Sequence, residues 1–301
     1  MNGKTVRIYG VPMDLGQNRR GVDMGPSAIR YANLQAQLRA MGFDTCDMGN
    51  VAVPQAEEKT DDSRNVNAHY LPEVAQVCQA TYDLICHTLQ PHEMGIFMGG
   101  DHSIAVGTVS AVSAQNGEIG VIWVDAHTDM NTPETTPSGN IHGMALAALL
   151  GAGADALVKI GRSGAKIKPE NVVVIGVRDV DAEERVRVKA SGITVYTMRE
   201  IDEKGIAAIA REILSKFERL QTLHVSFDLD SCEPRVAPGV GTPVPGGLTF
   251  REAHLLMEIL ADSGKVHTMD VVEVNPILDI ENRTARVAVE MITSLFGKRI
   301  L

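Results

Sequence analysis

Short apolar runs rich in β-branched residues recur along this chain and alternate with longer segments of helical character. The runs that we expect to form strands are 6–11 (preceded by Thr5), 94–98, 119–125, 171–177, 222–230 and 266–274. The helices that we expect between them include 71–89, 206–220, 249–261 and 284–295. Strands that are apolar along their whole length are typical of a parallel sheet covered by helices on both faces. The sequence therefore predicts an α/β fold around a mainly parallel sheet.

The size and charge of the chain narrow the classes of function. Its 301 residues, of which 44% are hydrophobic, are enough to bury a large core. No linker or shift of composition divides the chain, so we expect one domain over residues 1–301. The net charge of −10 argues against a nucleic-acid partner. The longest apolar stretch, 143–158, is interrupted by glycines and Asp155, so we expect no membrane partner either.

The N-terminal segment and the cysteines bear on the compartment. The first residues lead into a strand-like run without the long apolar core of a secretion signal, so we expect a cytoplasmic protein. The four cysteines have no CxxC or CxxH spacing, and a domain of this size can fold without disulfides. We therefore expect reduced thiols.

Residue types that commonly bind metals follow three of the predicted strands. The sequences at these points are GGDHS (99–103), DAHTD (125–129) and DLD (228–230). Side chains at i, i+2 and i+4 of an extended chain point to one side, which predicts that the members of DAHTD and of DLD converge. The two glycines allow a tight turn that brings His102 to the same crevice. In open α/β sheets, ligands bind at these carboxyl ends of the strands.

The charge of this set indicates a metal centre. Four aspartates in one pocket repel one another strongly unless cations neutralise them, and two divalent ions balance four carboxylates. Carboxylate and imidazole ligands without thiolate favour Mn²⁺ over a structural zinc. A purely structural role for DAHTD would leave buried charges without partners, which is costly. Asp101, in contrast, is assigned to a helix N-cap or turn.

Together these motifs resemble those of the ureohydrolase family, and within it the arginases of bacterial type. The resemblance extends from GVPMDLGQNRRGVDMGPSAIR near the N-terminus to EVNP at 273–276. It implies a three-layer α/β/α sandwich and two Mn²⁺ ions per chain. One ion would be bound by His102, Asp125, Asp129 and Asp228, and the other by Asp125, His127, Asp228 and Asp230. Asp125 and Asp228 would bridge the two ions.

The loop 131–140 bears on the substrate. Its prolines stiffen it, and its amides and hydroxyls can donate to an anion, although a solvated surface loop explains it as well. The resemblance implies that Asn131 and Ser138 hold the α-carboxylate of L-arginine, with Asn140 in the same loop. It also implies that Asp181 holds the α-amino group, with Glu184 nearby. Agmatine has no carboxylate, so the loop favours L-arginine.

Three further residues are candidates for catalysis or binding. His142 titrates near neutral pH and can move protons, although it can also be a helix-start residue. Glu273 ends an apolar strand and can pair with a planar guanidinium, unless it is a satisfied core carboxylate. Thr242 can add a hydroxyl contact, although a turn explains it about as well.

The reaction that we expect is the hydrolysis of L-arginine to L-ornithine and urea. A metal-bridging hydroxide, oriented by Asp129, would attack the guanidinium carbon. Either Asp129 or His142 would protonate the leaving amine, and the sequence does not distinguish them. The resemblance further implies arginine metabolism, the chemistry of the urea cycle, and a homo-trimer or homo-hexamer.

Other functions stay open at this point. The nearest is an agmatinase or another ureohydrolase with a guanidino substrate. A single-zinc, deacetylase-like enzyme and a non-catalytic, metal-dependent scaffold are more distant alternatives. One departure from the family pattern is Glu233 before Pro234, where the family usually has an aspartate. Glu233 is not an expected ligand, so the departure concerns only the local turn.

Overall fold

The structure is a computed structural model, and it describes residues 4–58 and 67–299. Its central feature is an eight-stranded sheet with the order β2-β1-β3-β8-β7-β4-β5-β6. Every pairing between neighbouring strands is parallel. The strands are β1 Thr5–Val11, β2 Asp44–Asn50, β3 Met94–Gly99, β4 Gly120–Val124, β5 Val172–Val177, β6 Thr194–Thr197, β7 Leu223–Asp228 and β8 Val266–Val272.

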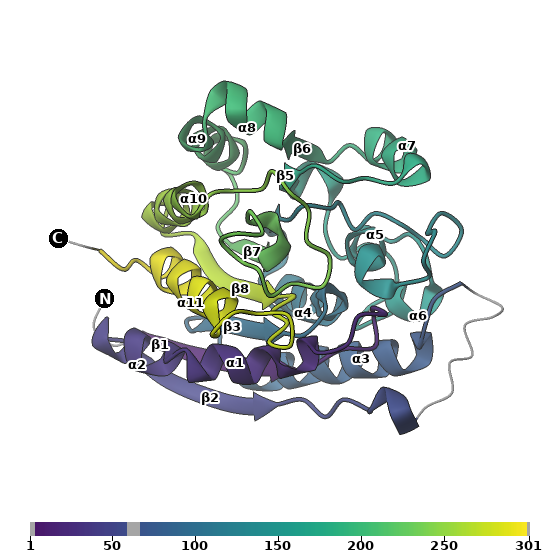
Figure 1. Cartoon of the computed structure of the whole chain (residues 1–301), viewed down its shortest axis with the longest axis horizontal. Coiled ribbons are helices and arrows are strands. Elements are labelled where there is room, and N and C mark those ends of the chain that lie inside the picture. Colours follow the sequence, from purple (N-terminus) through teal and green to yellow (C-terminus); the bar gives the residue numbers. More distant parts are fainter. Residues whose placement is uncertain (1–3, 59–66, 300–301) are drawn as a thin grey trace.

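Helices cover both faces of the sheet and bury two separate apolar cores, which makes three layers (Figure 1). On one face lie α1 Gly25–Tyr31, α2 Leu34–Ala40, α8 Met198–Lys204, α9 Ile206–Lys216, α10 Phe250–Asp262 and α11 Arg283–Leu295. On the other face lie α3 Leu71–Thr88, α4 Ala105–Asn116, α5 Ala145–Leu149 and α6 Asp155–Val158. The predicted α/β/α sandwich is confirmed.

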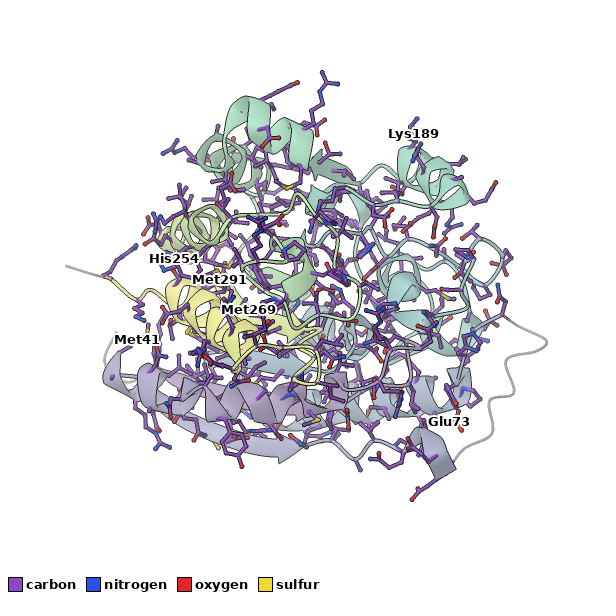
Figure 2. All side chains as sticks on the ribbon, viewed as in Figure 1. Met41, Glu73, Lys189, His254, Met269 and Met291 are labelled. Carbon is purple, nitrogen blue, oxygen red and sulfur yellow. The ribbon has the colours of Figure 1, made fainter. Side chains whose placement is uncertain are left out.

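The side chains show how the layers are held together. Met269 on β8 and Met291 on α11, both labelled in Figure 2, are fully buried in the same core. Helix α7, Ala182–Ser191, lies at the periphery, where Lys189 points away from the molecule (Figure 2). Glu184 is the buried residue of α7.

Within the described residues, no helix is both long enough and apolar enough to cross a bilayer.

The predicted strands and helices are present with shifted ends, but the two edge strands were not expected. β2 and β6 are only partly buried, so they lack the largely apolar sequence of the inner strands. Before α5, the residues Ile141–Met144, which include His142, form a 3-10 turn. Because β3, β8, β7 and β4 are neighbours and parallel, their carboxyl ends lie together at the middle of one sheet edge. This arrangement brings the polar motifs to one place.

Candidate active site

His102 lies among three carboxylates at this edge. Its Nδ1 atom is 3.1 Å from Oδ2 of Asp125, 3.1 Å from Oδ2 of Asp129 and 3.2 Å from Oδ2 of Asp228. All four residues are buried. Within the described chain, neither His102 Nδ1 nor Asp129 Oδ2 makes a well-directed hydrogen bond. Buried polar atoms are rarely left in this state, so the arrangement fits a cation that both atoms would bind.

His127 forms a second group beside the first. Its Nδ1 atom is 3.1 Å from Oδ2 of Asp230 and 3.4 Å from Oδ1 of Asp125. The ligand atoms of His102, Asp125 and Asp129 lie within 4.8 Å of one another, as do those of Asp125, His127 and Asp230. The two oxygens of Asp125 thus face different histidines, which is what a carboxylate shared by two cations requires. Asp228 faces the first group through Oδ2, and its Oδ1 accepts from the N–H of Asp230 in the second group.

These side chains converge, but not through strand alternation as the sequence predicted. β4 ends at Val124, so residues 125–129 are a loop, and Asp129 has a left-handed backbone with φ of 50°. Asp230 lies in a 3-10 turn after β7, where its N–H donates to Oδ1 of Asp228 at 2.8 Å. A left-handed non-glycine residue costs about 1–3 kcal/mol, and such residues cluster at functional sites.

Gly100, which precedes Asp101, lies where the backbone comes very close to that of Met13. A Cβ atom on Gly100 would lie 1.7 Å from the carbonyl oxygen of Met13, so only glycine fits where the chain turns toward His102. Asp101 caps the following 3-10 turn, because its Oδ1 accepts from Ser103 N at 3.0 Å. Asp101 also accepts from Gly16 N at 2.7 Å through Oδ2. Its predicted role as a capping residue is confirmed.

Hydrogen bonds hold the carboxylates in place. Oδ2 of Asp125 accepts from Trp123 Nε1 at 2.9 Å, and Oδ1 accepts from His127 N at 2.7 Å. Oδ2 of Asp230 accepts from Thr242 Oγ1 at 3.0 Å. The Thr242 hydroxyl is therefore directed at a proposed ligand in this structure.

The crowding of carboxylates is electrostatically costly without cations. Burial and the neighbouring charge of Asp125 raise the pKa of Asp129 to about 7. Burial, Asp230 and Asp125 likewise raise the pKa of Asp228. Burial acts in the same direction on Asp125, but contacts with His102 and His127 outweigh it and lower the pKa of Asp125. Divalent cations would remove this repulsion, and the oxygen and imidazole donors suit them.

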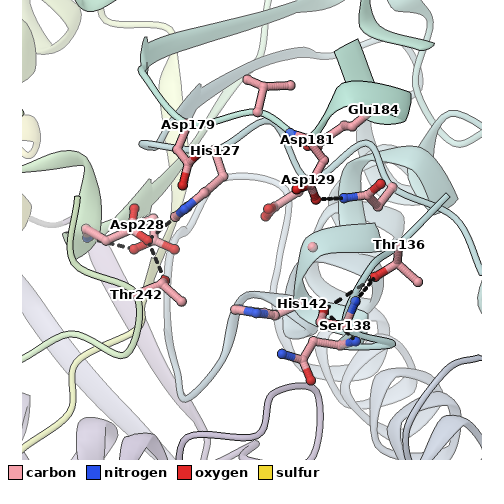
Figure 3. Close-up of a pocket in the computed structure, with 15 residues that line it drawn as sticks. His127, Asp129, Thr136, Ser138, His142, Asp179, Asp181, Glu184, Asp228 and Thr242 are labelled. Atoms are coloured by element: carbon pink, nitrogen blue, oxygen red, sulfur yellow. Dashed lines mark hydrogen bonds and ion pairs between the residues drawn. The ribbon is translucent and has the colours of Figure 1, made fainter. Parts of the chain in front are cut away.

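A cavity of about 250 Å³ opens beside this cluster (Figure 3). Its lining includes all six residues expected to bind substrate, namely Asn131, Ser138, Asn140, Asp181, Glu184 and Thr242. It also includes Thr136, Gly143, Asp179 and Val180, which were not predicted individually although they lie in or beside the predicted segments. The cavity carries carboxylates on one wall and neutral donors on the loop 131–140, and none of its lining residues is a lysine or arginine.

The start of α7 is tied to the loop that follows β4. Oε1 of Glu184 accepts from Thr128 Oγ1 at 2.6 Å and from Met130 N at 2.9 Å. Oδ2 of Asp181 accepts from Asn131 Nδ2 at 2.9 Å. Glu184 therefore anchors the wall of the cavity to residues 128–130, whereas Asp181 lies where this wall meets the loop 131–140.

Residues before α3 also support the loop 131–140, which the sequence did not predict. Asn67 Nδ2 donates to the carbonyl oxygens of Pro133 and Thr136, each at 3.1 Å. His69 Nε2 lies 2.9 Å from the carbonyl oxygen of Ser138. No motif marks these residues, because their partners are more than sixty positions away in the chain.

His142 lines the cavity, whereas Glu273 lies behind it. Nδ1 of His142 is 3.0 Å from Oε1 of Glu273, which also accepts from His102 N at 3.0 Å. Oε2 of Glu273 accepts from Gln17 Nε2 at 2.9 Å. Burial disfavours the charged form of His142, but the contact with Glu273 outweighs burial and raises the pKa of His142 to about 9. Both oxygens of Glu273 are engaged within the chain.

Glu233 closes the turn in which the sequence departs from the family pattern. Its Oε2 accepts from Gly246 N at 2.8 Å and from Gly247 N at 3.2 Å. The longer side chain thus fixes a neighbouring loop and does not enter the metal-ligand cluster. The four cysteines are free thiols, as expected.

Several known proteins that are similar to this chain in sequence and structure are arginases. The model of the arginase family matches residues 4–297. The arginase of Bacillus subtilis (strain 168) is 48% identical over 299 residues, which cover 99% of each chain. That of Bacillus caldovelox is 48% identical over 301 residues, which cover 99% of this chain and 100% of its own. A solved structure of the Bacillus caldovelox protein has a TM-score of 0.95 at 47% identity, with 99% of this chain and 100% of that chain covered.

Proposed function

This chain belongs to the arginase family, and we propose that it hydrolyses L-arginine to L-ornithine and urea with two Mn²⁺ ions. The convergence of two histidines and four aspartates beside a cavity supports the metal centre. We propose His102, Asp125, Asp129 and Asp228 as ligands of one ion, and Asp125, His127, Asp228 and Asp230 as ligands of the other. Bound divalent ions supply a hydroxide nucleophile near neutral pH.

The proton transfers fall to Asp129 and His142. Asp129 would hold a cation through Oδ2, so its other oxygen, Oδ1, is the atom that can hold a proton beside the reacting carbon. His142 lines the cavity and contacts Glu273 through Nδ1, which leaves Nε2 for exchange with the leaving amine or solvent. The leaving group departs far more readily as a neutral amine than as an amide anion, so Asp129 or His142 must deliver a proton to its nitrogen.

Glu273 can pair with the guanidinium of the substrate only if one of its present hydrogen-bond partners is replaced. Both of its oxygens have partners in the chain, and Oε2 is bonded to Gln17. For Glu273 to pair with the guanidinium, the substrate must replace Gln17 as the partner of Oε2. The two-point geometry of a guanidinium suits that exchange.

The cavity wall supports an α-amino acid as the substrate. Asp181 and its neighbour Asp179 are negative groups that can face the α-ammonium. Asn131, Ser138 and Asn140 are neutral donors that can face the α-carboxylate. Agmatine would leave these donors unpaired or only hydrated, which is the basis for discriminating against it.

We further propose a cytoplasmic homo-trimer or homo-hexamer whose residues 1–301 form one domain. The four free cysteines suit a reducing compartment. The family resemblance supports the assembly. Analytical ultracentrifugation of the purified protein tests the assembly directly.

Urea release by the metal-loaded protein tests the function. The chelated protein is compared with protein reloaded with Mn²⁺, and L-arginine is compared with agmatine. We expect activity only after reloading and a much higher kcat/KM for L-arginine. Full activity in metal-free protein would contradict the metal-based mechanism. Equal kcat/KM values for the two substrates would instead favour a broader ureohydrolase.

A further inference from the structure

A connected set of polar side chains lies inside the sheet, behind the proposed metal ligands. They are Thr108 on α4, His224 and Ser226 on β7, and Thr268 and Asp270 on β8. Each is at most 3% exposed, in a region that is otherwise apolar. Burying such groups is unfavourable unless their hydrogen bonds are satisfied. The set is joined to the active site by a contact of 2.8 Å between Ser226 Oγ and His102 Nε2.

Asp270 is the acceptor on which this network converges. Its Oδ2 atom accepts from Thr108 Oγ1 at 3.0 Å and from Ser226 Oγ at 3.2 Å. It also lies 3.1 Å from Nε2 of His224. An ionised carboxylate only accepts hydrogen bonds, so each of these neighbours must donate. Asp270 therefore determines the direction of the hydrogen bond from Ser226.

The direction at Ser226 determines which nitrogen of His102 carries the proton. A serine hydroxyl has one proton, and Ser226 gives it to Asp270. The oxygen of Ser226 then accepts from Nε2 of His102. A neutral His102 therefore has its proton on Nε2 and a lone pair on Nδ1. Nδ1 is the atom that faces Asp125, Asp129 and Asp228.

Two neighbouring contacts favour this arrangement, in which His102 has its proton on Nε2. Nδ1 of His224 lies 2.9 Å from Oγ1 of Thr268, so a ring that donates to Asp270 can accept from that hydroxyl. The ring of His102 stacks on Trp123, with centroids 4.1 Å apart and an interplanar angle of 13°. The stacking fixes the plane of His102, and the hydrogen bonds fix its tautomer.

We infer that Asp270 is a positioning residue that acts through Ser226 to present Nδ1 of His102 to a divalent cation. The inference rests on the metal centre of the proposed function. Partners of this kind, on the far side of a ligand histidine, typically change metal affinity by about 10–100-fold when they are replaced. Asp270 is separated from the cation position by Ser226 and His102, so its effect should be transmitted through these two residues.

Binding of Mn²⁺ to the full-length protein tests the inference. In Asp270→Asn, the amide can donate to Ser226, which frees the serine hydroxyl to donate to Nε2 of His102. The proton of His102 would then lie on Nδ1, where it competes with the cation. We expect Mn²⁺ to bind about 10–100-fold more weakly at one of its two positions, measured by competition with a chelator. The matched control Thr108→Val removes another donor to the same oxygen and should keep the wild-type affinity.

A double-mutant cycle separates positioning from a general loss of packing. Ser226→Ala should weaken the same position, and adding Asp270→Asn to it should cause no further loss, because the route to His102 is already cut. Ser226→Thr keeps a hydroxyl and should retain binding. Wild-type affinity in Asp270→Asn, or additive losses in the double variant, would overturn the inference. If Asp270→Asn does not fold, wild-type affinity in Ser226→Ala would overturn it alone.

The binding experiment also distinguishes this inference from the proposed function. A wild-type protein that binds two Mn²⁺ ions but releases no urea from L-arginine would contradict the function, while the comparison of variants would stand. A wild-type protein that binds no divalent ion would overturn both proposals.

Discussion

His142 Nδ1 lies 3.0 Å from Oε1 of Glu273, so the histidine that lines the cavity is oriented by a carboxylate that is itself fully buried. The same oxygen accepts from the backbone N–H of His102. Glu273 thus connects the proposed proton carrier to the segment that bears a proposed metal ligand. A buried carboxylate with three partners is held rigidly, which favours a fixed position for the imidazole.

Replacing His142 by Ala should lower kcat for urea release by about 10²-fold or more, because positioned general acids contribute about 10²–10⁴-fold. The Mn²⁺ content should stay at the wild-type value, since His142 is not among the proposed ligands. Steady-state kinetics and metal analysis of the same preparation check both statements. His87, an exposed histidine on α3, is the control position, and His87→Ala should behave like the wild type. An unchanged kcat in His142→Ala would remove this residue from the mechanism.

Asp181 has two roles that a single substitution can separate. It is the N-cap of α7, and it lines the cavity near Asn131. Asp181→Ser keeps a good capping side chain but removes the charge that would face the α-ammonium. A lost charge-assisted hydrogen bond is worth about 1.5–3 kcal/mol, so kcat/KM for L-arginine should fall roughly ten- to a hundredfold, mainly through KM.

Thermal unfolding of Asp181→Ser is the accompanying measurement. The variant should keep the wild-type melting temperature, because the helix cap is preserved. If its KM for L-arginine equals that of the wild type, Asp181 caps helix α7 but does not bind the substrate.

Asp228 at the end of β7 and Asp230 in the turn that follows should differ in their effect on metal content. Asp228 is proposed to contact both ions, whereas Asp230 lies beside His127. Asp230→Ala should therefore lose one ion per chain and retain most of the other, while Asp228→Ala should weaken both. Elemental analysis after gel filtration measures the stoichiometry. Two tightly held ions per chain in Asp228→Ala would contradict the bridging assignment.

The parts of this molecule that could be predicted from sequence are those with local signals. The inner strands are rich in apolar residues, so their positions could be predicted, and the motifs at their ends supplied the candidate ligands. Edge strand β2 was missed because its residues are partly exposed and polar. Helix α4 was missed because nine of its residues are buried, so it lacks the polar face that a helical period requires.

The supporting contacts of the site could not be predicted, because they join distant parts of the chain. Gln17 and Glu273 are 256 positions apart, and Ser226 and His102 are 124 apart. Nothing in the sequence around Gln17 or Asp270 marks a partner in a distant segment of the chain. Spacing along a chain indicates which residues can converge, but the folded sheet determines which of them share a hydrogen bond.

Asp14 should make stability depend on pH. It is nearly buried after β1, where its Oδ2 lies 3.2 Å from Arg20 Nη1 and accepts from Gly21 N at 3.2 Å. Burial outweighs these contacts and raises the pKa of Asp14 from 3.8 to about 7. Because the folded value is the higher one, the stabilising contribution of Asp14 is complete below pH 3.8 and is lost as the pH rises through about 7. Asp14→Asn removes this loss.

The free energy of unfolding of Asp14→Asn, relative to the wild type, should therefore increase as the pH rises from about 5 to 8, by on the order of 2 kcal/mol. Denaturant titrations of both proteins saturated with Mn²⁺ measure the difference, since the metal centre contributes equally to each. Asp47→Asn is the control of opposite sign. Burial acts to raise the pKa of Asp47, but the contact with Arg30 outweighs burial and lowers it. Asp47→Asn should therefore be less stable than the wild type by a constant amount from about pH 5 to 8. This difference should shrink only as the pH falls below about 4. A difference for Asp14→Asn that stays constant or decreases between pH 5 and 8 would show that Asp14 is already charged in the folded protein.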